Sequence, residues 1–116
     1  MRRVVITGIG AITPIGNTFP EYVEGLKNGV SGAGPITKFD ASLFRTQFAC
    51  EVKGFNAEDH IPRRDARRMD PFSHFAMVIA DEAMQHSGLD PEKIDSDRAG
   101  VIWGSGIGGF ETIEHD

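Results

Sequence analysis

Three glycines near the end of the sequence have a spacing with a known chemical use. Gly104, Gly106 and Gly109, in VIWGSGIGG, match G-x-G-x-x-G, which cradles a dinucleotide pyrophosphate when it follows a strand and opens a helix. The acidic partner of the ribose is expected about 20 residues further on, beyond Asp116. Two interpretations stay open: a nucleotide site, or a turn in which glycine permits a close backbone approach or a positive φ.

A second glycine pair, Gly8 and Gly10 in TGIGAITP, does not complete this pattern. Thr13 stands where the third glycine or alanine belongs. Pro14 would fall inside the first turns of the required helix, where proline removes a hydrogen bond and clashes with the preceding turn. We interpret this segment as a loop without a nucleotide site.

Four arginines within six residues form the most specific charged feature of a chain whose net charge is −5. They are Arg63, Arg64, Arg67 and Arg68. On a helix, Arg64, Arg67 and Arg68 share one face at spacings of three and four. That face is either a solvated surface partly neutralised by nearby carboxylates or a docking patch for an acidic partner. Nucleic acid is a poorer match, because no aromatic residues interleave with the arginines.

The cysteine and the histidines give no catalytic or metal-binding set. Cys50 is the single cysteine, which excludes an internal disulfide and is typical of a reducing compartment. It lies beside Glu51 in FACEVKGF, an alternating segment that predicts a half-exposed strand. A neighbouring carboxylate disfavours the thiolate, so we interpret Cys50 as a small buried side chain. Four histidines lack metal-site spacing: His60, His74, His86 and His115.

Two apolar runs predict strands of a parallel sheet. Residues 4–6 are β-branched, and residues 101–103 form a second run, as expected for strands buried on both faces. The segments between them alternate helix and loop, so the fold class is α/β. Only two strands of this kind are present, and a stable parallel sheet normally needs more. We therefore expect residues 1–116 to be the opening of a larger domain and not a complete independent one.

Local signals predict the helices between these strands. Thr18 and Glu21 have the spacing of a capping box, and Gly29 is expected to end the helix that follows. A longer helix is predicted from the Asp70-Pro71 pair to Gly88, because apolar residues recur there at spacings of three and four.

Weaker signals predict the structure of the remaining segments between residues 4–6 and 101–103. The arginine segment, PRRDARRMD, is expected to form one or two helical turns. Turns are predicted at Gly32, Gly34 and Pro35.

Composition is ordinary for a soluble globular protein, with 40% hydrophobic and 25% charged residues. No stretch approaches the roughly 20 apolar residues that span a bilayer. We expect a cytoplasmic protein with neither a membrane nor a nucleic acid as its partner.

Several stretches together resemble one family. RRVVITGIGAITPIGN, SGAGPITKFD, RRDARRMDPF and VIWGSGIGGFETIE are similar, in this order and over essentially the whole chain, to the N-terminal part of β-ketoacyl-acyl-carrier-protein synthase II, in the thiolase-like condensing enzyme family. The resemblance implies the N-terminal portion of a five-layer α-β-α-β-α fold, in an enzyme that is a homodimer. It also implies decarboxylative condensation of an acyl-enzyme with malonyl-acyl carrier protein in fatty acid elongation, with no cofactor.

The family's catalytic cysteine and two histidines match no residue here, so residues 1–116 alone are expected to be inactive. Two other features do match. Arg64, Arg67 and Arg68 correspond to basic positions that contact the acidic carrier protein, and Ile107 corresponds to a residue that lines the acyl pocket. Type I relatives have glycine at that position, so Ile107 favours type II. The alternatives are a polyketide-type ketosynthase or chain-length factor segment, and a dinucleotide-binding module that uses the GSGIGG loop.

Overall fold

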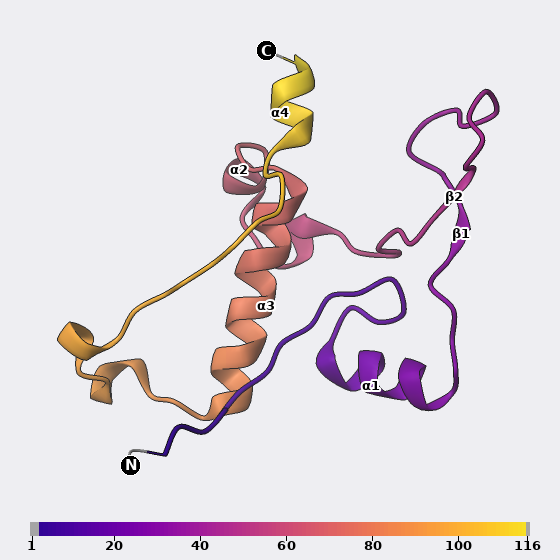
Figure 1. Cartoon of the computed structure of the whole chain (residues 1–116). Helices are drawn as coiled ribbons and strands as arrows, with labels where there is room; N and C mark the ends of the chain where they lie inside the picture. Colours follow the sequence, from indigo (N-terminus) through magenta and orange to yellow (C-terminus); the bar gives the residue numbers. More distant parts are fainter. Residues whose placement is uncertain (1–2, 116) are drawn as a thin grey trace. The chain divides into compact units, whose positions relative to one another are not determined.

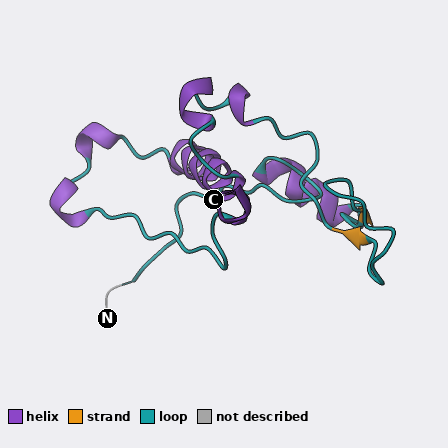
Figure 2. Ribbon diagram, turned by 90° about the horizontal axis from the view of Figure 1, so that it is seen from above, coloured by secondary structure: helices purple, strands orange, loops and turns teal. Residues whose placement is uncertain are grey.

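The computed structural model describes residues 3–115, except for the side chains of Glu111 and His115. The chain divides into two units, Ala11–Phe55 and a second unit made of Met1–Gly10 with Asn56–Asp116. Long loops join the elements of both units, which are one helix and two short strands in Ala11–Phe55 and helices and 3₁₀ turns in the other unit (Figures 1 and 2). No helix in residues 3–115 is long and apolar enough to cross a membrane.

Helix α1, Phe19–Lys27, lies in the unit Ala11–Phe55 and confirms the first predicted helix. Thr18 caps it, because the Thr18 hydroxyl accepts the N–H of Glu21 at 3.3 Å. The Glu21 carboxylate in turn accepts the N–H of Asn17 at 2.8 Å, one residue earlier than in the ideal capping box. Gly29, with φ 63°, follows the helix and ends it as predicted.

The sheet of this unit has two short antiparallel strands, β1 (Gly34–Pro35) and β2 (Phe48–Ala49). The N–H of Ile36 donates to the carbonyl of Gln47 at 3.1 Å, just beyond the paired residues. The predicted turns at Gly34 and Pro35 are wrong. The strand predicted from residue 48 onward does begin at Phe48 but ends at Ala49. Proline has no N–H to donate, so a ladder that contains Pro35 stays short.

Cys50 follows the end of β2 and is exposed. The prediction of a buried thiol is therefore wrong. An alternating pattern buries one face only where a ladder continues and another layer covers it. Here the ladder stops at Ala49.

Helix α3, Pro71–Ser87, is the longest element of the second unit and confirms the other predicted helix. Pro71 occupies its first turn, and Gly88 ends it in the left-handed region at φ 64°. The same unit holds α2 and α4 and three 3₁₀ turns. Their bounds are η1 Ala57–Asp59, α2 Arg63–Ala66, η2 Pro91–Lys93, η3 Ser96–Arg98 and α4 Phe110–His115.

The chain near its N-terminus passes close to the C-terminal half of α3 (Figure 1). A Cβ on Gly8 would overlap the carbonyl oxygen of Ala83, and one on Gly10 would overlap that of Ile79. The ring Nδ1 of His86 lies 3.1 Å from the backbone nitrogen of Ile9 and 3.2 Å from its oxygen. The two glycines that fail the nucleotide pattern thus allow backbone-to-helix packing.

The two predicted parallel strands are absent from the described chain. Residues 4–6 and 101–103 form no ladder with any described residue and are exposed, Ile102 at 99%. A strand exists only where its N–H and C=O groups pair with a neighbour, and β-propensity alone does not supply one. The described sheet has two strands, which is compatible with the expectation that these residues form only an incomplete N-terminal portion of the five-layer fold.

Candidate functional site

The arginine segment forms a continuous run of turns, as predicted. Helix α2 covers Arg63–Ala66, and Arg67 after it keeps a right-handed helical backbone. The N–H of Arg68 donates to the carbonyl of Asp65 at 3.0 Å, and that of Met69 to Ala66 at 3.2 Å. The turns therefore extend through the last arginine of the cluster.

Packing against α3 fixes which side of this segment faces outward. Ile61 and Ala66 are buried, with exposed fractions of 7% and 6%. From α3, the His74 Nε2 lies 2.7 Å from the carbonyl oxygen of Ala66, a distance at which a protonated Nε2 donates. Ile61 and Ala66 therefore form the buried side of this segment, and His74 contacts the Ala66 carbonyl. The arginine side chains lie on the exposed side.

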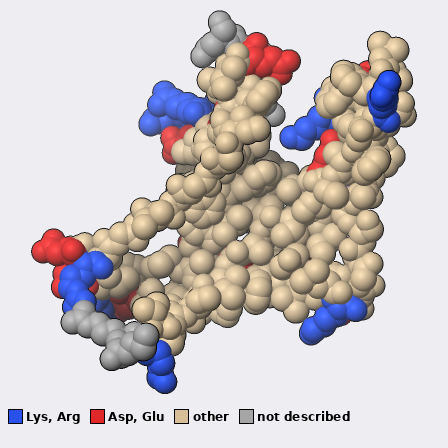
Figure 3. Space-filling model, viewed as in Figure 1, with Lys and Arg blue, Asp and Glu red and all other residues tan. Residues whose placement is uncertain are grey.

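The four arginines line one open hollow. Figure 3 shows the basic side chains gathered over α2. The structure thus brings together the three predicted docking residues, Arg64, Arg67 and Arg68, and adds Arg63 to them. Arg63 was left out because the family resemblance assigns docking to the other three arginines, although its spacing of four residues from Arg67 was a signal.

The arginines differ in how far their charges are already neutralised. Arg63 Nε lies 3.3 Å from Glu58 Oε1, and Arg64 Nε lies 3.7 Å from the carboxylate of its neighbour Asp65. Arg67 and Arg68 form no ion pair with any residue in the part of the chain that the structure describes. The interpretation as a solvated, neutralised face therefore fits Arg63 better than it fits the last two arginines.

The loop before α4 carries Ile107, and glycines shape it. Gly108 has φ 87°, and its N–H donates to the Ser105 hydroxyl at 3.0 Å. A Cβ on Gly109 would overlap the carboxylate of Asp70, whereas Gly104 and Gly106 have no close neighbour. The Ile107 side chain is 75% exposed.

The same geometry argues against a dinucleotide at this loop. A phosphate would need the N-terminal end of α4, where the Asp70 carboxylate already lies against Gly109. Two like charges at one position repel. The turn interpretation of the glycines is the one that the structure supports, since Gly108 has a positive φ and Gly109 a close approach.

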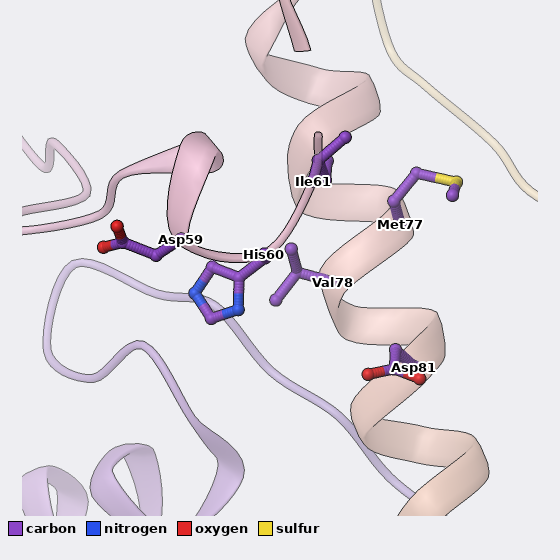
Figure 4. Close-up of a pocket in the computed structure, with 6 residues that line it drawn as sticks. All are labelled: Asp59, His60, Ile61, Met77, Val78 and Asp81. Carbon is purple, nitrogen blue, oxygen red and sulfur yellow. The ribbon is translucent and has the colours of Figure 1, made fainter. Parts of the chain in front are cut away.

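A second hollow, of about 480 Å³, lies between residues 59–61 and α3. It is lined by Asp59, His60, Ile61, Met77, Val78 and Asp81 (Figure 4). Among the described residues no group of three or more His, Cys, Asp or Glu is arranged to hold a metal ion. The fourth histidine of the sequence, His115, lies outside the described side chains. Its polar lining residues are two aspartates and one histidine, and we assign this hollow no chemistry.

The fold is that of the N-terminal domain of a thiolase-like ketosynthase, and two solved structures show it. One is the ishigamide ketosynthase/chain length factor, 40% identical with a TM-score of 0.68 over 80% of this chain and 23% of that chain. The other is a type II polyketide synthase acyl-carrier protein in complex with its ketosynthase bound to the hexaketide. It is 25% identical, with a TM-score of 0.59 over 78% of this chain and 23% of that chain.

The chain belongs to the β-ketoacyl synthase family. The family model "Beta-ketoacyl synthase, N-terminal domain" matches residues 1–116, which confirms the resemblance. Two similar relatives are both 3-oxoacyl-[acyl-carrier-protein] synthase 2, from Synechocystis sp. at 47% identity and from Staphylococcus aureus (strain COL) at 48%. Each alignment covers 113 residues, which is 97% of this chain and 27% of the relative. The chain thus spans about a quarter of the length of the curated relatives that it matches.

Proposed function

We propose that residues 1–116 are the N-terminal part of a 3-oxoacyl-[acyl-carrier-protein] synthase of fatty acid elongation. The reaction is decarboxylative condensation of an acyl-enzyme with malonyl-acyl carrier protein. The identity of 47–48% to two such synthases over nearly the whole chain carries the proposal. Following the family resemblance, the complete enzyme is a homodimer of the cytoplasm.

In this proposal the segment supplies surfaces, and the reactive groups lie in another part of the enzyme. None of the residues here matches the family's catalytic cysteine or histidines, so residues 1–116 alone are inactive and form no complete independent domain. The exposed apolar residues at 4–6 and 101–103 support this reading, because apolar runs of this kind are normally covered by further strands.

The first test is whether the intact enzyme makes the ketoacyl product from acyl- and malonyl-loaded carrier protein. Residues 1–116 alone are expected to make none. A polyketide-type ketosynthase or chain-length factor is the second candidate, favoured by the 40% identity to the ishigamide structure. Product analysis separates the two candidates. One condensation per turnover on saturated acyl chains supports a fatty acid enzyme, and repeated condensation without reduction supports a polyketide enzyme.

We further propose that the arginine cluster docks the acidic carrier protein, with Ile107 lining part of the acyl pocket. Arg67 and Arg68 support docking because they are exposed and their charges are not paired with described carboxylates. Such charges attract an acidic partner before contact, and dissolved salt screens the attraction. Arg63, beside Glu58, contributes less because its field is partly cancelled.

The docking test reverses two charges in the intact enzyme with Arg67→Glu and Arg68→Glu. Surface charge pairs contribute about 0.2–1 kcal/mol each, and the reversal also adds repulsion. We therefore expect the KM for carrier-bound substrate to rise about tenfold at low salt, with little change in kcat. The increase should shrink as salt is added.

Arg98→Glu is a control for charge reversal elsewhere on the surface, because it reverses a single charge at η3, outside the hollow. It should leave the KM near that of the unmodified enzyme. A KM that is insensitive both to the double reversal and to salt would refute docking at this cluster, even if the enzyme is an active synthase.

A further inference from the structure

Asp70 uses its side chain in an unexpected way. By position it is the N-cap of α3, and its carbonyl oxygen accepts the N–H of Ser73 at 2.9 Å. Aspartate at an N-cap normally also accepts an N–H of its own helix through the carboxylate, but Asp70 makes no such bond. Instead its Oδ1 accepts the hydroxyl hydrogen of Thr112, in α4, at 2.8 Å. The carboxylate thus connects the start of one helix to another helix.

Gly109 is the residue that permits this connection. Its Cα lies so close to Asp70 that a Cβ would overlap Oδ2. On the other side of Ile107, the Ser105 hydroxyl accepts the N–H of Gly108. The short turn that carries Ile107 is therefore held by Ser105 before it and by the Asp70–Thr112 hydrogen bond after it.

We propose that Asp70 and Thr112 are positioning residues that hold this turn and thereby set which acyl chain lengths the enzyme accepts. This inference rests on the proposed function, in which Ile107 lines the acyl pocket. The Ile107 side chain is 75% exposed, so the backbone on either side fixes its place more than packing does. A hydrogen bond from a hydroxyl to a carboxylate is stronger than one between neutral groups. Its loss lets the turn move.

The test compares two substitutions of Thr112 in the intact enzyme. Thr112→Val keeps the side-chain shape and removes the hydroxyl, and Thr112→Ser keeps the hydroxyl as the matched control. For Thr112→Val we expect the ratio of kcat/KM for a long over a short acyl chain to change about fivefold. Thr112→Ser should keep the original ratio, and the KM for malonyl-carrier protein should not change in either variant.

Asp70→Ala gives an independent check. It should shift the ratio in the same direction as Thr112→Val, and the double variant should add little to either single one, because both remove the same hydrogen bond. If the effects of Asp70→Ala and Thr112→Val on this ratio add in the double variant, the two residues do not act through one hydrogen bond and the proposal is wrong.

Ile107→Phe separates a failure of this inference from a failure of the proposed function. If Ile107→Phe changes chain-length preference and Thr112→Val does not, the positioning role is wrong and the synthase function stands. If the unmodified intact enzyme makes no ketoacyl product, the proposed function is wrong, and this inference falls with it.

Discussion

Replacing Gly8 with alanine is expected to disturb the contact between the N-terminal segment and α3. The added Cβ would overlap the carbonyl oxygen of Ala83 and lie 2.8 Å from the Cβ and 2.9 Å from the backbone nitrogen of Ser87. These are helix atoms that cannot swing away as the end of a flexible side chain can. Either residues 8–10 move outward or the last turns of α3 distort.

Gly100→Ala is the matched control that isolates this effect. A Cβ on Gly100 meets nothing within 4 Å, and its backbone has no positive φ. Both substitutions reduce the freedom of the unfolded chain alike, a stabilisation of about 0.4–1 kcal/mol. That contribution cancels between them. Overpacking costs about 1–3 kcal/mol, so Gly8→Ala should be less stable than Gly100→Ala by about 2 kcal/mol.

Urea unfolding of the intact protein measures this difference through the transition midpoints at a shared m-value. Amide hydrogen exchange shows where the structure is destabilised, since the last turns of α3 should lose protection in Gly8→Ala and not in Gly100→Ala. Equal stabilities of the two variants, to within about 0.5 kcal/mol, would refute the close packing of Gly8 on α3.

Two further predictions concern Ile107 and Glu51. Ile107→Phe should lower kcat/KM for long acyl chains and spare short ones, because the larger ring takes space in the proposed pocket; equal losses for both lengths would contradict that role. The Thr37 hydroxyl, 2.6 Å from Glu51 Oε2, and the Thr37 N–H lower the pKa of the Glu51 carboxyl. The two hydrogen bonds from Thr37 therefore stabilise the folded protein at pH values above the ordinary pKa of glutamate. This stabilisation is lost as pH falls through the lowered pKa of Glu51 in the folded state. Thr37→Val should raise the pKa of Glu51 towards its ordinary value, and an NMR titration that shows no rise would rule out the hydroxyl as the cause.

The helices were predictable because their signals are local. The Thr18–Glu21 cap, Pro71 in the first turn and Gly88 at the end act within a few residues of the structure that they specify. The run of turns at the arginines follows from the same kind of information. In these segments the sequence prediction and the structure agree closely.

The strands were not predictable in the same way, because a strand depends on its partner. The β-branched residues 4–6 suit a buried strand but find no ladder among the described residues, while Gly34–Pro35, expected to be a turn, pairs with β2. The burial of Cys50 was misjudged for the same reason.

For the candidate site, the sequence alone determined which chemistry is available: a cluster of positive charge at Arg63–Arg68, glycines on both sides of Ile107, and no set of reactive groups. Only the tertiary structure decided how these parts are used. It left Arg67 and Arg68 unpaired among the described residues while Glu58 pairs with Arg63. It also brought Asp70 against Gly109, which turned an ambiguous glycine motif into a packed turn. The physical reason is that charge and backbone freedom belong to single residues, whereas neutralisation and close approach depend on neighbours that are distant in the sequence.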